Sequence, residues 1–279
     1  MAISLKRGIG PVAVTGANGL VGRAVVGRLA RLVPDVRSLT RSGDLSAGLR
    51  GAEVIVHLEG EIVPNRPDTY ASSNLGTVLA MLDAAPRTVR RVVFLSFAGA
   101  ERTSPNEYLR AKAVAEDAIH MSLLPSVVLR ANHIIGPPSR PGPLALSLAA
   151  HKGHVTTLGS GAQLLSPILS DDVAEVIASA VLDPLAPVGT FRLDGPDEMT
   201  MDELARLIVG PDVSIRHLPA PLARMLAHVD PELTPEFVDI LLRDLPAGTD
   251  PVDTAGLFEV HLHHISQVWA GPRSLVGAA

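Results

Sequence analysis

The chain has 279 residues, a formal net charge of −5 and no cysteine, and hydrophobic residues make up 47% of it. Scattered basic residues argue against a nucleic-acid surface, and the missing cysteines exclude disulfides and thiolate metal ligands. No run reaches the roughly 18 apolar residues of a membrane span, and we expect no signal peptide and a cytoplasmic protein. The apolar excess favours strands buried on both faces of a parallel sheet.

A glycine-rich turn near the N-terminus is the most informative segment. Residues 15–22 read Thr-Gly-Ala-Asn-Gly-Leu-Val-Gly, after a short apolar strand and before an apolar helical pattern. We expect Gly16 to adopt a positive φ, Gly19 to leave room for a ligand and Gly22 to let strand and helix pack closely. Such a turn presents free backbone N–H groups to a pyrophosphate.

Strand and helix patterns alternate along the first two thirds of the chain, which predicts an α/β fold with a doubly wound parallel sheet. We expect a dinucleotide-binding core over residues 1–135 and a smaller α+β substrate lobe over 136–279, partly interleaved with the core. The predicted strands are Val12–Val14, Val36–Leu39, Val54–Leu58, Arg91–Ser96, Ser126–Leu129, Thr156–Gly159 and Gly189–Leu193. The predicted helices are Leu20–Leu32, Tyr70–Ala85, Glu107–Met121, Leu144–Lys152, Asp171–Leu182, Thr200 to Val209 and about Pro235–Arg243.

Two groups of charged residues are expected to have structural rather than catalytic roles. The arginines Arg87, Arg90 and Arg91 are expected to lie in solvent around a helix end and a strand entry. Asp171 and Asp172 stand at the start of a predicted helix, where we expect them to cap the free N–H groups and to anchor the packing of the helix. Neither group is predicted to be catalytic.

The histidines are not expected to bind a metal. His261, His263 and His264 are close in sequence, but convergent carboxylate or thiolate ligands are missing nearby. His57 lies within an apolar strand and is expected to be a hydrogen-bonded core residue.

Several segments together resemble the extended and atypical branches of the short-chain dehydrogenase/reductase superfamily, whose dinucleotide-binding core is a Rossmann fold. The atypical branch includes NmrA-like redox sensors and a complex I accessory subunit. The resemblance runs from Pro11 to about residue 209, and more loosely to the end. It rests on the order of Thr15–Gly22, Val54–Gly60, Asn74–Thr77, Tyr108–Lys112, Ser166–Ile168 and Asp171–Ala174.

Tyr108 and Lys112 are the predicted catalytic pair. Residues four apart share one face of a helix, and a nearby ammonium lowers the pKa of a phenol by favouring the phenolate. The phenol then exchanges a proton with a carbonyl or alcohol oxygen while hydride moves to or from nicotinamide. The resemblance also implies that Lys112 holds the nicotinamide ribose and that Ser96 hydrogen-bonds the substrate oxygen. If the active hydroxyl belongs two residues later, Ala98 has replaced it.

Further site residues follow from the turn and from the resemblance. Predicted cofactor-binding residues are Thr15, Gly16, Ala17, Asn18, Gly19, Leu20, Val21, Gly22, Arg41, Asp44, Leu45, Leu58, Glu59, Gly60, Asn74 and Lys112. Predicted substrate-contacting residues are Phe97, Ala98, Asn132 and His133, and the loop Gly136–Gly142 is a candidate lid.

The end of the second strand bears on cofactor choice. Arg41 stands where a carboxylate would accept the 2′-hydroxyl of NAD, and it favours the 2′-phosphate of NADP. NAD is the alternative, because Glu59 disfavours a phosphate nearby. The family usually has a further strand between Val36–Leu39 and Val54, which is missing here, and Asp44 and Leu45 are the candidates for contact with the adenine.

These observations predict an oxidoreductase that transfers hydride between NADPH and a small carbonyl or alcohol. One alternative is a non-catalytic NADP(H) sensor or accessory protein; another is a nucleotide-sugar epimerase or dehydratase. We expect a monomer or homodimer with a small-molecule substrate and no nucleic-acid partner. The sequence does not identify the substrate.

Overall fold

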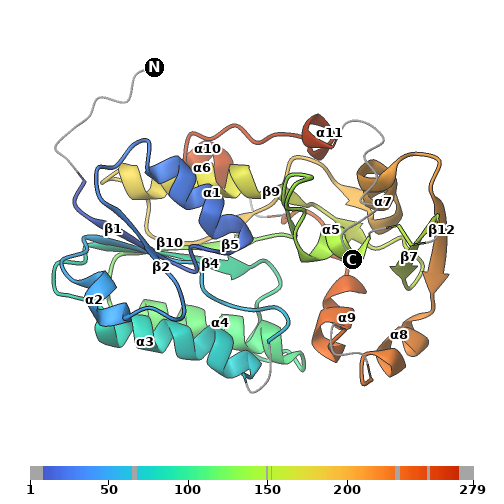
Figure 1. Ribbon diagram of the computed structural model, residues 1–279, viewed down its shortest axis with the longest axis horizontal. Helices are drawn as coiled ribbons and strands as arrows, with labels where there is room; N and C mark the ends of the chain where they lie inside the picture. Colours follow the sequence, from blue (N-terminus) through green and yellow to red (C-terminus); the bar gives the residue numbers. More distant parts are fainter. Residues whose placement is uncertain are drawn as a thin grey trace.

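A six-stranded parallel sheet lies at the centre of the computed structural model (Figure 1). The structure describes residues 9–64, 68–148, 150–151, 153–229, 233–249 and 252–269. The strands follow the order β2-β1-β3-β4-β5-β10 across the sheet, with every neighbouring pair parallel. They are β1 (Val12–Thr15), β2 (Val36–Leu39), β3 (Val54–His57), β4 (Arg91–Phe97), β5 (Ser126–Ala131) and β10 (Gly189–Leu193).

Helices cover both faces of this sheet, so the predicted doubly wound α/β fold is confirmed (Figure 1). On one face lie α1 (Leu20–Leu29) and α6 (Ser170–Leu182). On the other lie α2 (Leu45–Leu49), α3 (Thr77–Ala84) and α4 (Glu107–Met121), with a π-helical turn, η1 (Ala71–Gly76), leading into α3.

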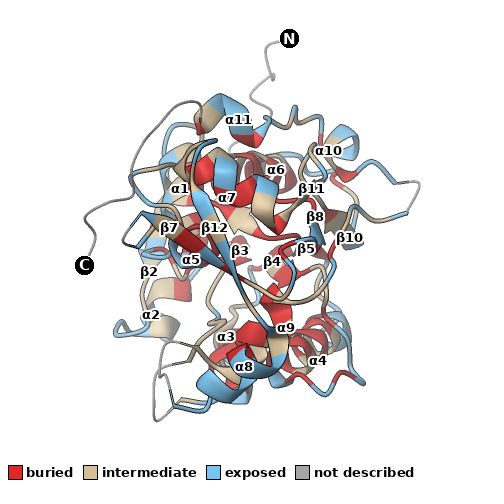
Figure 2. Cartoon of the chain, turned by 90° about the vertical axis from the view of Figure 1, so that its right-hand side faces the viewer, coloured by how far each residue is buried: buried red, intermediate tan, exposed pale blue. Residues whose placement is uncertain are grey.

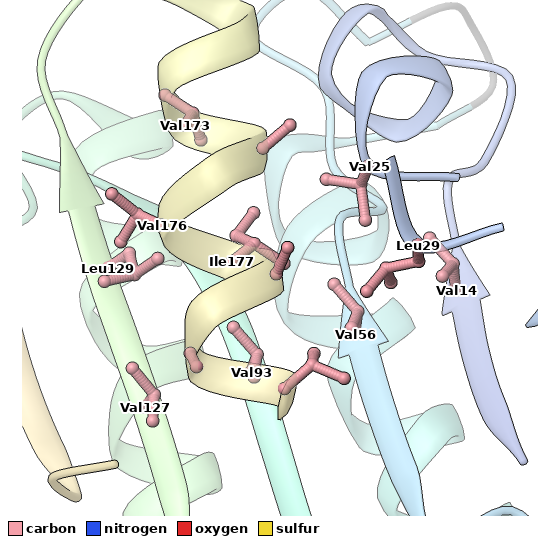
Figure 3. Close-up of a cluster of buried hydrophobic side chains, with 14 of the residues drawn as sticks. Val14, Val25, Leu29, Val56, Val93, Val127, Leu129, Val173, Val176 and Ile177 are labelled. Atoms are coloured by element: carbon pink, nitrogen blue, oxygen red, sulfur yellow. The ribbon is translucent and has the colours of Figure 1, made fainter. Parts of the chain in front are cut away.

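The core between the sheet and α1 and α6 consists almost entirely of aliphatic side chains (Figure 3). Every residue of β1 and β3 is buried, because helices shield both faces of these strands. Each large aliphatic side chain buried in this way contributes about 1.5–3 kcal/mol to stability. The residues labelled in the close-up are Val14, Val56, Val93, Val127 and Leu129 of the strands and Val25, Leu29, Val173, Val176 and Ile177 of the helices.

Short elements from the second half of the chain form a lobe beside the carboxyl ends of the strands, and buried residues are concentrated in the sheet and its flanking helices (Figure 2). The lobe pairs β7 (His154–Leu158) with β12 (Ser214–Leu218), and smaller pairs join β6 (Ile134–Ile135) to β9 (Ile168–Leu169) and β8 (Leu164–Leu165) to β11 (Met199–Thr200). Its helices are α5 (Pro143–Ser147), α7 (Met201–Val209), α8 (Ala220–Leu226), α9 (Pro235–Leu241), α10 (Thr254–Leu257) and α11 (Ile265–Val268). The sheet domain consists of the central sheet and the helices that cover it, including β10 and α6. The second half of the chain therefore contributes to both the sheet domain and the lobe.

Three predicted helices differ from the structure by more than two residues or are divided. The first ends at Leu29 rather than Leu32, and the second splits into η1 and α3. The helix predicted over Leu144–Lys152 covers only Pro143–Ser147, because the chain turns towards β7 through a backbone bridge between His151 and His154. Residues 149 and 152 lie outside the described part of the chain.

The solvated position predicted for Arg91 is wrong. Its side chain is buried, and its guanidinium donates to the backbone oxygens of Ala180, Asp183, Pro184 and Ala186. Those carbonyls lie at and just beyond the end of α6, where a helix leaves its last acceptors unpaired. Arg91 therefore caps α6 from the neighbouring strand β4.

Of the two roles predicted for Asp171 and Asp172, the side-chain cap is wrong, whereas the packing anchor is confirmed for Asp172. Leu169 is the N-cap of α6, and no side chain caps it. The buried Asp172 carboxylate instead accepts from the backbone N–H of His263 at 2.8 Å and pairs with its Nδ1 at 2.7 Å. Asp172 thus fastens the segment before α11 to the sheet domain.

Helix α2, rather than a strand, occupies the connection from β2 to β3. Asp44 is its N-cap and accepts from the N–H of Ala47 at 3.0 Å. The family's further strand is absent from this described segment, so β2 forms one edge of the sheet. Among the described residues, no helix has the length and apolar character needed to cross a membrane.

Candidate active site

Two glycines of the turn between β1 and α1 are required by the fold. Gly16 has φ +66°, and a Cβ there would lie 2.8 Å from the backbone N of Glu59. A Cβ on Gly22 would collide with the carbonyl oxygen of Gly16. These glycines hold the turn tightly against the start of the helix and the end of β3.

Gly19 has a different role, because the backbone does not require a glycine there. Its φ is −67°, which any residue adopts, and a Cβ would approach only the Gly16 carbonyl oxygen, at 3.2 Å. Gly19 is exposed, and no side chain caps the N-terminus of α1. The first N–H groups of α1 therefore face an open surface, the arrangement that favours an anion.

Two adjoining pockets extend from this turn along the carboxyl ends of the strands. The outer pocket measures about 490 Å³ and the inner pocket about 210 Å³, and Leu58 and Gly60 line both. The outer pocket is lined by Gly16, Asn18, Gly19, Thr40, Arg41, Ser42, Leu58, Glu59, Gly60 and Glu61. The inner pocket is lined by Leu20, Val21, Leu58, Gly60, Ile62, Asn74, Leu95, Ser96, Phe97, Tyr108, Lys112, Ala131, Asn132, His133, Ile134, Pro143, Leu144 and Phe237.

Tyr108 and Lys112 reach the inner pocket together from α4. Asn106 caps this helix by accepting from the N–H of Leu109, which sets the register that places both residues on one face. Lys112 Nζ donates to the carbonyl oxygen of Leu95 at 2.7 Å and lies 4.4 Å from the Phe94 ring centroid. No described residue hydrogen-bonds the Tyr108 hydroxyl.

The predicted lowering of the Tyr108 pKa by Lys112 is wrong for this arrangement. Burial raises the pKa of the phenol well above its usual value, and the neighbouring Tyr70 adds to the effect. Burial lowers the pKa of Lys112 to about 8, although Glu116 opposes the change. Tyr108 is therefore a protonated phenol at neutral pH, which is suited to donating its proton.

Asn74 brings an unpaired acceptor to the pocket wall. Its Nδ2 donates to the backbone oxygens of Glu61 and Tyr70, both at 3.0 Å, whereas its buried Oδ1 has no partner. A Cβ on Gly60 would lie 2.8 Å from that oxygen and 3.8 Å from Lys112 Nζ. The acceptor and the ammonium thus flank the stretch where the two pockets join.

The Ser96 hydroxyl does not point freely into the pocket. It donates to the buried carboxylate of Glu116, which also forms a bidentate ion pair with Arg130. Ser96 lines the inner pocket, but its hydroxyl is already paired within the protein, and Ala98, two residues on, has none. The Ser96 hydroxyl is therefore not free to bond a substrate oxygen while it is paired with Glu116.

Asn132 and His133 follow β5 and line the same pocket. Asn132 is fully engaged: its Nδ2 donates to Asp194 Oδ1 and Leu245 O, and its Oδ1 accepts from the N–H of His133. The ring of His133 packs against Phe97 at 5.5 Å, and its buried Nε2 has no partner. Burial lowers the pKa of His133 to about 4, so the imidazole is neutral.

At the outer pocket, Arg41 is surrounded by acidic side chains. It pairs with Glu59 at 3.1 Å, Glu61 at 3.1 Å and Asp68 at 3.0 Å. Hydrogen bonding to Glu59 raises the pKa of Arg41 further above its usual value. A phosphate approaching Arg41 therefore meets both a guanidinium and carboxylates.

Most predicted site residues line one of the two pockets. Six do not: Thr15 hydrogen-bonds His57, Ala17 and Gly22 are buried in the turn, Asp44 and Leu45 form the start of α2, and Ala98 packs in the lobe core. His57 bonds Thr15 Oγ1 and lies 3.3 Å from Thr77 Oγ1, as expected of a core histidine. Among the described residues, no group of acidic or histidine side chains forms a metal site.

Several pocket residues were not predicted. Phe237 comes from α9 and lines the inner pocket. No local pattern marks Phe237, because its position depends on how α9 folds back. Tyr70, the other tyrosine of the chain, does not line the pocket but packs edge-on against Tyr108 at 6.3 Å, while its hydroxyl contacts Thr234 Oγ1 at 2.6 Å.

The predicted lid loop is tied down on both sides. Gly136 N–H donates to Pro141 O at 2.9 Å across the loop, and the Gly136 carbonyl accepts from Trp269 Nε1 at 3.1 Å. The indole of Trp269 is buried against the lobe. These contacts fix the loop beside Leu20 of α1.

A parallel sheet with a bare glycine turn after its first strand, and with pockets along the carboxyl ends of its strands, defines a Rossmann-like dinucleotide-binding protein. The profile of the NAD dependent epimerase/dehydratase family matches residues 12–189, and the chain belongs to this family. The resemblance to the extended short-chain dehydrogenases is thereby confirmed.

Proteins with different names are similar to this chain in sequence or in structure. The chain is 28% identical over 251 residues to the Arabidopsis thaliana protein named NADH dehydrogenase [ubiquinone] 1 alpha subcomplex subunit 9, mitochondrial; the match covers 77% of this chain and 61% of the relative. It is 24% identical over 263 residues to a UDP-2-acetamido-2,6-beta-L-arabino-hexul-4-ose reductase of Pseudomonas aeruginosa, covering 87% and 69%. The structure of human epimerase family protein SDR39U1 with NADPH matches with a TM-score of 0.63 at 20% identity, covering 90% of this chain and 98% of that one.

Proposed function

We propose that the protein is an NAD(P)-dependent oxidoreductase that transfers hydride between the dinucleotide and a small carbonyl or alcohol. The observation that carries this proposal is the pair of adjoining pockets, which begins at the glycine turn and ends at Tyr108 and Lys112. Such a path matches an extended dinucleotide with its phosphates at the turn and its reactive end in the inner pocket.

The described residues fit this cofactor. The open space at Gly19 and the uncapped start of α1 would take the pyrophosphate, and the unpaired Asn74 Oδ1 and Lys112 Nζ would take ribose hydroxyls. When bound, the reduced nicotinamide supplies a hydride to the substrate carbon.

Tyr108 is the proposed proton donor in carbonyl reduction. Its buried phenol keeps its proton at neutral pH, and its hydroxyl has no competing partner among the described residues. Lys112 lies on the same helix face and lines the same pocket, where its proposed role is the ribose contact rather than a lowering of the Tyr108 pKa.

The inner pocket favours a small uncharged substrate. Its lining is mostly aliphatic or aromatic, and Lys112 is the single charged side chain among the described lining residues. Among the described residues that line this pocket there is no arginine to pair with the pyrophosphate of a nucleotide sugar. The inner pocket therefore favours a small carbonyl substrate over a nucleotide sugar, which remains the alternative substrate class within the family.

A non-catalytic dinucleotide-binding accessory protein is the second candidate. The paired Ser96 hydroxyl and the absent hydroxyl at Ala98 favour it, and the Arabidopsis relative is named as a subunit of a larger enzyme. The presence of Tyr108 and Lys112 in one pocket favours catalysis.

For the cofactor, Arg41 favours NADP(H), together with the hydroxyl-bearing Thr40 and Ser42 beside it in the outer pocket. Glu59 and Glu61 oppose a phosphate, so we expect only a modest preference for NADPH over NADH. Cytoplasmic localisation and a monomeric or homodimeric state are also proposed; cell fractionation and light scattering test them.

The test combines calorimetry with turnover. We expect micromolar binding of NADPH, weaker binding of NADH, and reduction of members of a panel of small ketones and aldehydes. In Tyr108→Phe, turnover falls at least about 100-fold while NADPH affinity changes less than about threefold, because the phenol serves the proton transfer. Binding without turnover in the wild type would favour the accessory protein, and binding of neither dinucleotide would contradict both candidates.

A further inference from the structure

Apart from Tyr108, no described residue of the inner pocket has a free hydroxyl that could hydrogen-bond the substrate oxygen. Of the described residues that line the inner pocket, only Ser96 and Tyr108 carry a hydroxyl, and that of Ser96 is donated to Glu116. A carbonyl oxygen that gains negative charge during reduction is stabilised when a second donor acts beside the proton donor.

His133 has the uncommitted polar atom that could fill this role. Its side chain is 6% exposed, it lines the inner pocket, and its Nε2 is buried without a partner. The other candidates are used: Asn132 is saturated by Asp194, Leu245 and the His133 backbone, and Asn74 Oδ1 is an acceptor only.

His133 and Tyr108 both line the inner pocket, and both pack against Phe97. The Phe97 ring lies 5.5 Å from the His133 ring and 5.8 Å from the Tyr108 ring, so the two polar side chains flank one phenylalanine in one pocket. A neutral imidazole carries one N–H donor and one acceptor. It therefore donates to a carbonyl oxygen without bringing a second positive charge next to Lys112.

We propose that His133 donates the second hydrogen bond to the substrate oxygen, in place of a serine or threonine hydroxyl. The inference rests on the proposed oxidoreductase function. In reduction, the substrate carbon gains a hydride from the reduced dinucleotide, the electron pair of the C=O π bond moves to oxygen, and oxygen takes the Tyr108 proton. His133 keeps its proton and orients the oxygen, and the apolar pocket around it selects neutral carbonyl compounds.

The kinetic test compares two substitutions. His133→Phe preserves the packing against Phe97 but removes the hydrogen bond, whereas His133→Asn retains a donor. We expect His133→Phe to lower kcat by about 100-fold, with NADPH affinity within about twofold of the wild type, and His133→Asn to recover part of the loss. The matched control is His217→Phe. His217 lies on β12 in the lobe, away from the inner pocket, and pairs with Asp202. Wild-type kcat in His133→Phe would overturn the inference.

A binding measurement separates this inference from the proposed function. Isobutyramide, a neutral mimic of a bound carbonyl, is titrated into NADPH-saturated protein while the imidazole ¹⁵N resonances are followed by NMR. A shift of the His133 resonances that is lost in His133→Phe supports the inference even if no carbonyl compound is turned over, in which case the proposed function alone fails. Unmoved His133 resonances overturn it, whereas loss of turnover in Tyr108→Phe would leave the proposed function standing.

Discussion

The three turn glycines differ in what a single added methyl group would meet. At Gly16 the obstacle is the backbone of the segment after β3, combined with a positive φ. At Gly22 it is the turn itself, whereas at Gly19 it is one carbonyl oxygen at 3.2 Å. The first two residues serve folding, and Gly19 leaves the helix N-terminus bare for a ligand.

Alanine substitutions should separate these roles. We expect Gly16→Ala to lower the free energy of unfolding by at least about 1–2 kcal/mol, because alanine is strained at positive φ. Gly19→Ala should change it by less than about 1 kcal/mol while weakening NADPH binding at least about tenfold. Gly27→Ala is the control: a Cβ added there would meet nothing within 4 Å, and the substitution should raise stability by about 0.5–1 kcal/mol. Urea unfolding and calorimetry give the two readouts, and unchanged NADPH affinity in Gly19→Ala would contradict the assignment.

At the scale of elements, helix α6 is held from both ends by distant side chains. Arg91 of β4 caps its last carbonyls, and Asp172 in its first turn binds His263. The bond to His263 spans 91 residues of sequence. It joins the sheet and its flanking helices to the C-terminal segment in which the Trp269 indole donates to the Gly136 carbonyl.

Removing the Asp172 carboxylate should lower the free energy of unfolding more than removing that of its neighbour Asp171. Asp172→Ala is expected to lower the free energy of unfolding by about 2 kcal/mol, because a buried acceptor of two hydrogen bonds is lost. Asp171→Ala, exposed one position away, should cost less than about 1 kcal/mol from its place in the first helical turn. Thermal and urea unfolding measure both, and the His263 amide should exchange faster only in Asp172→Ala. Equal losses of unfolding free energy in the two variants would show that the contact between Asp172 and His263 does not stabilise the fold.

At the scale of the whole molecule, the site lies between a sheet domain and a lobe that comes mainly from the second half of the chain. Phe237 of α9 closes the inner pocket, and the contact between Tyr70 and Thr234 ties α9 to the sheet domain. Two histidines are buried as neutral side chains: His57 in strand β3 and His133 in the inner pocket. Their neutrality makes the stability of the whole fold depend on pH.

Acid should therefore destabilise the protein through these histidines. Burial lowers the pKa of His57 to about 3 and of His133 to about 4, whereas the unfolded chain takes up these protons near pH 6.5. The stability gained from keeping them neutral is present above about pH 6.5 and is lost as pH falls towards 4 and 3, by on the order of 1–2 kcal/mol per histidine on reaching about pH 5. Urea unfolding at about pH 7 and pH 5 measures this loss, and His133→Phe should make it smaller. An equal loss in His133→Phe would show that His133 is not buried as a neutral side chain.

Much of this protein is determined locally by its sequence. The glycine spacing, the unbroken apolar strands and the four-residue separation of Tyr108 and Lys112 predicted the sheet, the turn and the shared helix face. They did so because φ preference, strand burial and helix periodicity act between near neighbours. The Thr200–Glu203 capping box that opens α7 is a local feature of the same kind.

What the tertiary structure decided depends on residues that are distant in sequence. The pKa of Tyr108 is raised because the folded chain buries the phenol, and Lys112 of α4 donates to the Leu95 carbonyl of strand β4. Ser96 loses its free hydroxyl to Glu116, and Phe237 completes the pocket from α9. Burial and partner choice arise only when these segments pack together, and they determine the chemistry of side chains whose positions the local pattern predicted.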